Sequence, residues 1–217
     1  MKIPKYQAVI LDLDQTLTTD MPSWLQFTRM LGADHRKHFR IYERFKVGEL
    51  SYPDAKNELL DLWRATGRLE RRSIERIFKR VDLRKGAAEA VAYLQQKYRV
   101  CIISGAIDVF VEEVSEKLGI KEYYAATRFL FDDEGILKDF DYTLSRGEEK
   151  IGFFEDFCKK YYLQPGECAA IGDGDSDQPI FEAVGMPVLF VAEETGKELQ
   201  KKYKRQIKHW SEIKKYL

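Results

Sequence analysis

The stretch Val9-Ile10-Leu11-Asp12-Leu13-Asp14-Gln15-Thr16-Leu17-Thr18 decides the fold that this sequence predicts. Residues 8–11 are all apolar, which is typical of a strand buried on both faces in the middle of a parallel sheet. Such a strand delivers Asp12 and Asp14 to its carboxyl end, where open α/β sheets bind their ligands. Because side chains alternate along an extended chain, both carboxylates are expected to point the same way.

Asp12 and Asp14 are expected to repel each other. Two carboxylates about 5 Å apart at an effective dielectric constant of ~20 repel by roughly 3 kcal/mol. Such a pair requires a cation or a shared proton. The stretch therefore predicts a charged site as well as a strand.

The length and composition indicate a folded protein with one large core. The 217 residues suffice for that core and a smaller additional module. Apolar residues make up 44% of the chain and aromatic residues 13%, which excludes an intrinsically disordered chain. No segment approaches the ~20 apolar residues of a membrane helix, and no apolar signal region precedes the first strand. We therefore expect a cytoplasmic protein without a membrane partner.

The charge balance argues against nucleic acid as a partner. Lys+Arg and Asp+Glu both number 36, so the formal net charge is zero. The tail at residues 193–217 is basic, but its apolar residues fall on one helical stripe. The stripe consists of Leu199, Tyr203, Ile207 and Trp210. We expect a surface helix that packs on the protein through this stripe, rather than a site for an anionic partner.

The pattern after Thr18 changes from strand to helix for about sixty residues. Asp20 or Ser23 is expected to cap the first helix, and Ser51 followed by Pro53 is typical of the start of a later one. Apolar residues recur at helical spacing in four segments, 24–31, 38–45, 52–63 and 69–81. Four helices with matching apolar faces predict a small bundle over the carboxyl end of the first strand. The expected domains are a core of residues 1–18 and 83–217 and a helical cap of residues 19–82.

Helix and strand alternate from residue 83 onward. Buried strands are expected at 99–103, 168–171 and 187–191, and a strand with a hairpin at 124–142. Helices are expected between these strands. Repeated strand–helix units predict an α/β fold with a doubly wound, Rossmann-like parallel sheet.

Polar clusters follow three of the predicted strands. They are Asp12 with Asp14, Ser104 with Gly105, and the run from Asp173 to Asp177. Each cluster alone is typical of a solvated loop. Because the three share one edge of one sheet, together they predict a functional site.

These motifs and their order resemble those of the haloacid dehalogenase-like phosphohydrolases. Asp-x-Asp-x-Thr at 12–16 is followed by Ser104, Lys150 and then Gly-Asp-Gly-x-x-Asp at 172–177. The resemblance covers residues 6 to about 191, and the helical insertion matches the phosphoserine phosphatase-like branch. Members of the family that cleave carbon–halogen bonds lack the second acid, so the presence of Asp14 favours phosphoryl chemistry.

The resemblance implies the same catalytic roles as the residues themselves. Asp12 would attack phosphorus to form an aspartyl-phosphate, and Asp14 would act as general acid and then as general base. Mg²⁺ suits a pocket of carboxylates. Its ligands would be Asp12, the main-chain carbonyl of Asp14, and Asp173, with Asp177 in support.

The remaining groups would bind phosphate or order the loops. Ser104 and the Gly105 amide would hold phosphoryl oxygens, and Lys150 would offset negative charge, with Arg146 as a competitor for that role. The substrate would be a small phosphorylated metabolite, and the protein a monomer or homodimer. Three hydroxyl residues are expected to order the nearby loops: Thr16, Thr18 and Ser176.

The chain departs from the family pattern on the side of the substrate. Phosphoserine phosphatases place a glutamate where this chain has Met21; Asp20 could replace it, but the apolar entrance at 21–24 suits a larger or less polar leaving group. Asp175 is an additional acid that either assists metal binding or faces solvent. Trp24 and Phe27 belong either to the core of the cap or to the wall of the substrate site.

Three function classes follow from these observations. A phosphatase, phosphoserine phosphatase included, and a phosphotransferase would use the same residues. A silent phospholigand-binding protein would have lost one of four residues that are all present: Asp12, Asp14, Lys150 and Asp173.

The cysteines and histidines predict no further site. The chain has three cysteines, Cys101, Cys158 and Cys168. They form no CxxC motif, and their odd number would leave one unpaired, which argues against a set of disulfides and against a zinc site. The histidines share no metal-ligand spacing and are expected at the surface or as helix caps: His35, His38 and His209.

Overall fold

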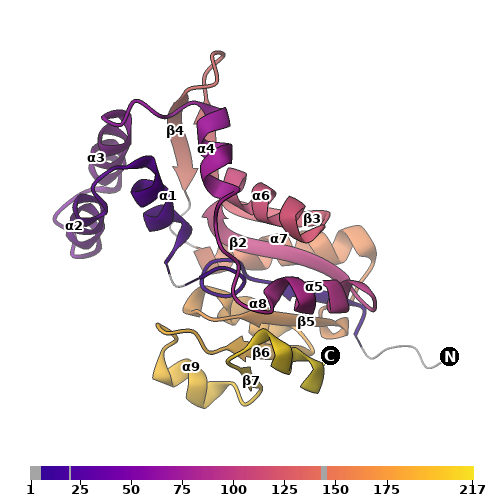
Figure 1. Cartoon of the computed structure of the whole chain (residues 1–217). Helices are drawn as coiled ribbons and strands as arrows, with labels where there is room; N and C mark the ends of the chain where they lie inside the picture. The colour runs from indigo at the N-terminus through magenta and orange to yellow at the C-terminus, as the bar shows by residue number, and fades with distance from the viewer. Residues whose placement is uncertain (1–5, 20, 143–145) are drawn as a thin grey trace.

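The computed structural model describes residues 6–19, 21–142 and 146–217, without the side chain of Arg146. Over these residues, seven strands form one sheet in the order β4-β3-β2-β1-β5-β6-β7 (Figure 1). Neighbouring strands run parallel except β3 and β4, which are antiparallel. The strands are β1 (Ala8–Leu11), β2 (Arg99–Ile107), β3 (Glu122–Phe131), β4 (Leu137–Tyr142), β5 (Cys168–Gly172), β6 (Met186–Phe190) and β7 (Gln206–Ile207). The predicted α/β fold with a doubly wound sheet is confirmed.

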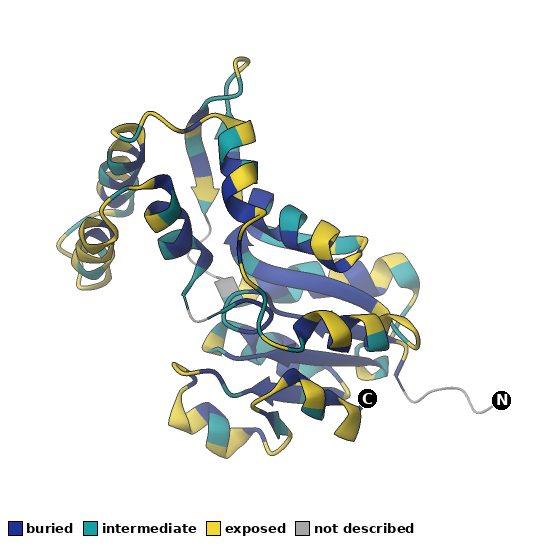
Figure 2. Cartoon of the chain, in the orientation of Figure 1, coloured by how far each residue is buried: buried dark blue, intermediate teal, exposed yellow. Residues whose placement is uncertain are grey.

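Strand β1 lies at the centre of the sheet and is buried along its whole length (Figure 2). Its residues alternate between two hydrophobic clusters. Val9 and Leu11 belong to one cluster, whereas Ala8 and Ile10 belong to the other. This burial on both faces is the reason for the continuous apolar run in the sequence.

Helices cover both faces of the sheet. Helices α5 (Ala87–Gln95) and α6 (Asp108–Leu118) pack on one face. Helices α7 (Arg146–Tyr161), α8 (Gln178–Ala183) and α9 (Lys197–Lys202) contribute to the cluster on the other face. The helices thus cover the two faces of the sheet and leave the edge formed by the carboxyl ends of the parallel strands uncovered by these helices.

The described residues between β1 and α5 form four helices, as predicted. They are α1 (Ser23–Leu31), α2 (His35–Lys46), α3 (Tyr52–Arg64) and α4 (Arg71–Phe78). Ser51 caps helix α3, and its side chain accepts a hydrogen bond from the Asp54 amide. Helix α4 packs on α6, so the insertion is continuous with the core. The domain boundaries at 18/19 and 82/83 stay a prediction.

The β3–β4 hairpin extends beyond the sheet to meet the insertion (Figure 1). The amide of Leu137 donates to Leu69 O and that of Arg71 donates to Gly135 O. Lys56 of α3 forms an ion pair with Asp139 of β4 at 2.7 Å. The sequence predicted the hairpin but not this contact, which makes β4 one wall of the space beneath the insertion.

The predicted helix at residues 193–217 is wrong. This tail forms only the short helix α9, then strand β7 and a 3-10 helix at Trp210–Lys215. Its four apolar stripe residues are nevertheless buried. Ile207 O accepts from the Val191 amide, so pairing with the open edge of β6 replaces the helix that the spacing indicated.

Two predictions about individual side chains are also wrong. His38 is buried rather than exposed, because its Nδ1 lies 2.6 Å from Thr28 Oγ1 and its ring lines a cavity. Ser23 does not cap α1, since its hydroxyl is turned toward Asp14; Asp20 lies outside the described residues. His35 and His209 are exposed, as expected.

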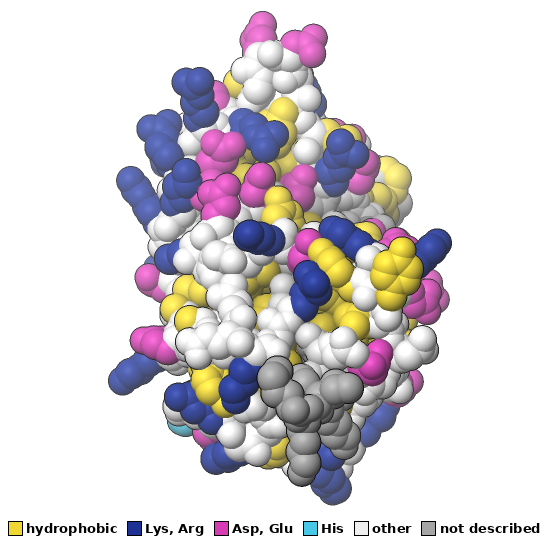
Figure 3. All heavy atoms as spheres, turned by 90° about the vertical axis from the view of Figure 1, so that its right-hand side faces the viewer, with side chains coloured by type: hydrophobic (Ala, Val, Ile, Leu, Met, Phe, Trp, Pro, Cys, Tyr) yellow, Lys and Arg dark blue, Asp and Glu magenta, His cyan; other side chains and the backbone are white. Residues whose placement is uncertain are grey.

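In the described structure the three cysteines are buried and have free thiols. Figure 3 shows basic and acidic side chains distributed together over one face, which matches the balanced composition. No helix in the described part of the chain has both the length and the apolar composition needed to cross a bilayer.

Candidate active site

The predicted site residues converge at the carboxyl edge of the sheet. The Asp12 amide donates to Ile171 O at 2.9 Å, which continues the pairing of β1 and β5 by one residue. Asp12 and Asp173 therefore follow adjacent strands side by side. Regular pairing of β2 with β3 reaches Ser104 and shifts before Ile107, so Ser104 lies at an irregularity within β2 rather than at its end.

Lys150 joins two of the carboxylates. Its Nζ donates to Asp12 Oδ1 at 2.6 Å and to Asp177 Oδ1 at 2.7 Å. The lysine is only 2% exposed. Burial disfavours its charged form, but the two carboxylates outweigh that effect and raise the pKa of Lys150. It is therefore a fixed positive charge at the edge of the sheet.

The three nearest acids leave negative charge in excess. Asp12, Asp173 and Asp177 each have an oxygen within 4.8 Å of the others, and all three are buried. Burial raises the pKa of Asp12 to about 6 and that of Asp173 to about 8, although Lys150 acts in the opposite direction. One lysine cannot balance three carboxylates, and the donors are all hard oxygens, so the group fits a divalent cation such as Mg²⁺.

Gly172 provides the space that Asp177 occupies. A Cβ atom at residue 172 would lie 2.3 Å from Asp177 Oδ2 and 2.4 Å from its Cγ. The Gly174 amide donates to Asp177 Oδ2 at 3.1 Å, which holds the carboxylate over that gap. The first glycine of the Gly-Asp-Gly motif therefore has a steric role that the sequence reading did not assign.

Asp14 faces the helical insertion instead of the acid cluster. Its Oδ1 accepts from the Ser23 amide at 2.9 Å and its Oδ2 accepts from the Ser23 hydroxyl at 2.8 Å. Burial raises the pKa of Asp14 to about 7, while the Ser23 hydroxyl acts in the opposite direction. Ser23 is nine residues away, and no local motif indicated this contact.

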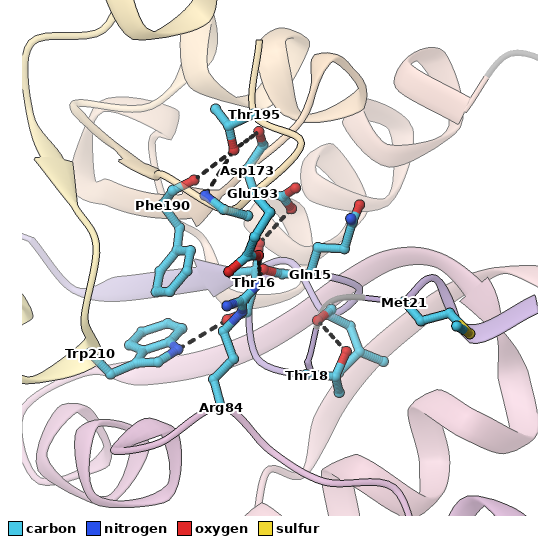
Figure 4. A network of polar contacts seen from close by, with 12 residues as sticks. Gln15, Thr16, Thr18, Met21, Arg84, Asp173, Phe190, Glu193, Thr195 and Trp210 are labelled. Atoms are coloured by element: carbon cyan, nitrogen blue, oxygen red, sulfur yellow. Dashed lines mark hydrogen bonds and ion pairs between the residues drawn. The ribbon is translucent and has the colours of Figure 1, made fainter. Parts of the chain in front are cut away.

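Contacts from distant segments order the loop after β1 (Figure 4). Thr16 Oγ1 donates to Asp173 Oδ1 at 2.7 Å, and Trp210 Nε1 donates to Thr16 O at 3.0 Å. Arg84 Nε donates to the carbonyl of Gln15, which has a left-handed backbone with φ of 61°. The loop that carries both motif acids is therefore held by the core and by the tail.

A cavity of about 390 Å³ opens above these residues. Its floor includes Asp12, Asp14, Lys150 and Asp173, together with Ser104. Its walls come from α1, α2, α3 and β4, so the insertion and the hairpin enclose the space next to the acids. This size and this position are typical of a small-molecule site.

The comparisons identify the family of this site. A family model described as haloacid dehalogenase-like hydrolase matches residues 9–182. The chain belongs to the haloacid dehalogenase-like hydrolase family. The resemblance inferred from the motifs is thus confirmed.

Relatives of this hydrolase are named phosphoserine phosphatases. One from Archaeoglobus fulgidus is 26% identical over 88% of this chain, and this chain spans 54% of its length. One from Methanocaldococcus jannaschii is 25% identical over 89% of this chain and 90% of its own. A solved phospho-aspartyl intermediate analogue of phosphoserine phosphatase has a TM-score of 0.71, 23% identity, and covers 98% of this chain and 99% of its own. That likeness shows the shared fold.

The hydrolase brings Asp12, Asp173 and Asp177 into one cluster with Lys150. Asp14, Ser104 and Gly105 lie outside that cluster but line the same cavity. Asp175 is exposed and accepts from Gln178 Nε2, so it faces solvent. Phe27 is core, whereas Trp24 lines the cavity. The side chain of Arg146 lies outside what the structure describes.

The hydroxyl residues near the site have different contacts. Thr16 and Thr18 are both buried, and Thr18 Oγ1 donates to Leu13 O. Ser104 Oγ accepts from the Ala106 amide at 3.2 Å, and Gly105 O accepts from Thr127. Ser176 lines the cavity. Thr16 therefore acts on the acid cluster directly, and Thr18 on the loop that carries it.

Proposed function

We propose that this hydrolase is a Mg²⁺-dependent phosphatase that cleaves a small phosphomonoester through a phosphorylated Asp12. The observation that carries the proposal is the position of Asp12. Its carboxylate lies at the end of the central strand, faces the cavity and is held 2.6 Å from the buried Lys150. Lys150 thus fixes the orientation of the carboxylate and stabilises negative charge beside it.

In the first step, an Asp12 carboxylate oxygen attacks phosphorus, and the bond from phosphorus to the alcohol oxygen breaks. Asp14, acting as a carboxylic acid, gives its proton to the departing oxygen. The two hydrogen bonds from Ser23 hold Asp14 at the boundary between the acid cluster and the walls. Asp14 lines the same cavity as Asp12, so it can reach a leaving oxygen bound in that space.

In the second step, Asp14 takes a proton from water as the water oxygen attacks phosphorus. The bond between Asp12 and phosphorus breaks, inorganic phosphate leaves, and both acids return to their starting states. General acid–base catalysis of this kind contributes a factor of roughly 10² to 10⁴ in rate. The same group serves both steps because it is protonated in one and ionised in the other.

Asp12, Asp173 and Asp177 would hold Mg²⁺, with the main-chain carbonyl of Asp14 as a further ligand. When bound, the cation neutralises charge on the transferring phosphoryl group. Thr16 holds Asp173 in place through its hydroxyl, and Gly174 holds Asp177 through its amide. The ligand set is therefore supported by fixed donors.

Ser104 and the Gly105 amide are proposed to bind phosphoryl oxygens opposite Lys150. Both residues line the cavity, and Ser104 is buried. The Ala106 amide donates to the Ser104 hydroxyl oxygen, which leaves the hydroxyl hydrogen for an acceptor in the cavity. The phosphate would thus be enclosed by donors on two sides.

Phosphoserine is the candidate substrate that the names of the relatives support. The similarity in sequence to these relatives, and the fold shared with the solved phosphoserine phosphatase, make that chemistry accessible to this chain. The walls of the cavity differ in character from its floor, so the phosphate and the alcohol of a phosphomonoester would meet different surroundings.

The proposal is tested by phosphate release from p-nitrophenyl phosphate, with Mg²⁺ and with a chelator. We expect metal-dependent release that falls by at least about 10⁴-fold in Asp12→Asn. Asp175→Asn is the matched control, because this exposed acid lies in the Gly-Asp-Gly-x-x-Asp motif, does not line the cavity and accepts a hydrogen bond from Gln178. Equal activity of Asp12→Asn and wild type would refute the role of Asp12, and transfer to an added alcohol in place of water would indicate a phosphotransferase.

A further inference from the structure

The walls of the cavity are aromatic, in contrast to its floor. Seven of the described lining residues are Trp, Phe or Tyr, and all seven come from α1, α2, α3 and β4. Aliphatic residues such as Leu25, Ile41 and Leu59 also line the cavity. A leaving alcohol whose phosphate lay on the floor would project into this aromatic space.

The aromatic rings of the walls form stacked and edge-to-face pairs, which are the arrangements that aromatic side chains prefer. Tyr52 stacks with Tyr142 at a centroid distance of 6.2 Å and an interplanar angle of 23°. Trp24 meets Tyr142 edge to face at 5.6 Å and 89°. Phe45 meets Tyr52 at 6.3 Å and 62°. A further ring in the cavity would find both faces and edges to contact.

The walls offer little to the charged groups of phosphoserine. None of the described lining residues from α1, α2, α3 and β4 is Asp or Glu, so these walls supply no counter-charge for an ammonium group. Besides the acids of the floor, Glu194 is the acidic residue of the described lining, and it follows β6 rather than belonging to these walls. Lys56 is the lysine of these walls, and Asp139 already pairs with it at 2.7 Å. A serine carboxylate would have to compete with Asp139 for that charge.

Two aromatic side chains of the walls lie open to solvent. Phe39 is 52% exposed and Tyr42 is 44% exposed, and both project from α2 and line the cavity. Exposed side chains of this size gain free energy when an apolar ligand covers them. Because they are not part of the buried core, they can be replaced without disturbing the fold.

We propose that the leaving group is an aromatic alcohol, so that the substrate is the phosphate ester of an arylalkyl or aryl alcohol rather than phosphoserine. The inference rests on the proposed phosphatase function and assigns its substrate class. The floor binds the phosphate, and the aromatic walls bind the ring. Phe39 and Tyr42 are specificity-determining residues that cover the outer side of the ring.

The first test measures binding, so that it does not depend on turnover. 2-Phenylethylphosphonate and 2-amino-3-phosphonopropionate are titrated into the protein with Mg²⁺ present. A single apolar group in a fitted pocket changes selectivity by about 10- to 200-fold, so we expect the phenyl ligand to bind at least 10-fold more tightly. Equal binding, or tighter binding of the amino acid ligand, would overturn the inference.

The second test uses variants of α2. Phe39→Ser/Tyr42→Ser should weaken 2-phenylethylphosphonate about 5-fold or more and leave methylphosphonate unchanged. Val47→Ser is the matched control, since Val47 is 66% exposed at the end of the same helix and does not line the cavity. A loss in the control equal to that in the double variant would also contradict the inference.

Hydrolysis separates this inference from the proposed function. 2-Phenylethyl phosphate and O-phosphoserine both release alkyl alcohols, so a difference in kcat/KM reflects recognition more than leaving-group reactivity. A preference for O-phosphoserine, with p-nitrophenyl phosphate still hydrolysed, would overturn the substrate class alone. Failure to hydrolyse any ester with Mg²⁺ would remove the proposed function, while the phosphonate titration would still decide whether the walls bind a ring.

Discussion

The floor and the walls of one cavity follow different physical rules. The floor consists of buried charges, such as Lys150 and Asp12, that reach each other across 138 residues of sequence. The walls consist of aromatic side chains, some of them half exposed, from the insertion and the hairpin. From this difference we propose that the sheet edge determines the chemistry, whereas the insertion and the hairpin determine which alcohol is accepted.

The contrast has an energetic origin. A buried charge without a partner costs several kcal/mol, so every group on the floor requires its neighbours. An aromatic side chain at a half-exposed wall contributes about 1 kcal/mol through each ring contact, and its replacement is tolerated. Substitutions on the floor are therefore expected to have larger effects than substitutions on the walls.

The largest effect is expected from Lys150→Met. Removing this charge leaves three buried carboxylates without their lysine, which should lower the free energy of unfolding by about 3–5 kcal/mol in metal-free buffer. Phosphatase activity should fall by at least about 10²-fold. Urea unfolding and phosphate release measure the two effects. Lys160→Met, on the surface of the same helix, is the control, and a similar loss there would contradict the assignment.

Gly172→Ala tests the steric basis of the floor. The added Cβ would displace the Asp177 carboxylate, so the affinity for Mg²⁺ should fall about 10- to 100-fold. The Mg²⁺ concentration that gives half-maximal activity is the measurement. Gly152→Ala places a Cβ in open space within α7 and should leave that concentration unchanged. An unaltered Mg²⁺ titration of Gly172→Ala would show that Asp177 does not support the cation.

On the side of the walls, His38 should make stability depend on pH. Burial lowers the pKa of His38 from 6.5 to about 4, so the unfolded chain binds a proton that the folded chain excludes. Stability should therefore fall as the pH drops from about 6.5 to 4, by at most roughly 3 kcal/mol from this group. Urea unfolding of wild type and His38→Gln at pH 7.5 and 4.5 measures the effect. The same pH dependence in both proteins would exclude His38 as its source.

The smallest effects are expected from two serines at the starts of helices, one of which should affect activity and the other stability. Ser23→Ala removes a hydroxyl donor from Asp14, worth about 1.5–3 kcal/mol for a charged acceptor, and should lower kcat by about 10-fold or more. Ser51→Ala removes a helix cap and should cost about 1 kcal/mol of stability without changing kcat. If both variants keep full activity, Ser23 does not position Asp14.

The residues of the floor could be predicted from the sequence more completely than those of the walls. The central strand and its acids could be predicted, because an apolar run followed by Asp12 and Asp14 requires a buried strand ending in charge. Lys150 followed from motif order alone. These residues are constrained by chemistry, so their types and spacing carry the information.

The contacts that sequence reasoning missed are tertiary. The pairing of Ile207 with β6 overrode the helical spacing of the tail. His38 is buried by its contact with Thr28, and Ser23 turns toward Asp14 instead of capping its helix. Each outcome depends on a partner that lies elsewhere in the chain or that the fold brings close. Trp210 contacts Thr16 across 194 residues of sequence. The only indication of this contact in the sequence was that Trp210 belongs to the apolar stripe of the tail.

The most direct test of the central claim is acid quenching of a reaction with p-nitrophenyl phosphate and Mg²⁺, followed by mass spectrometry of the peptide that contains Asp12. We expect a phosphoryl group on Asp12 in wild type, and none in Asp12→Asn or with a chelator. Steady release of phosphate by wild type, with no phosphoryl group on Asp12 at any quench time, would contradict the claim that the floor of the cavity acts through this carboxylate.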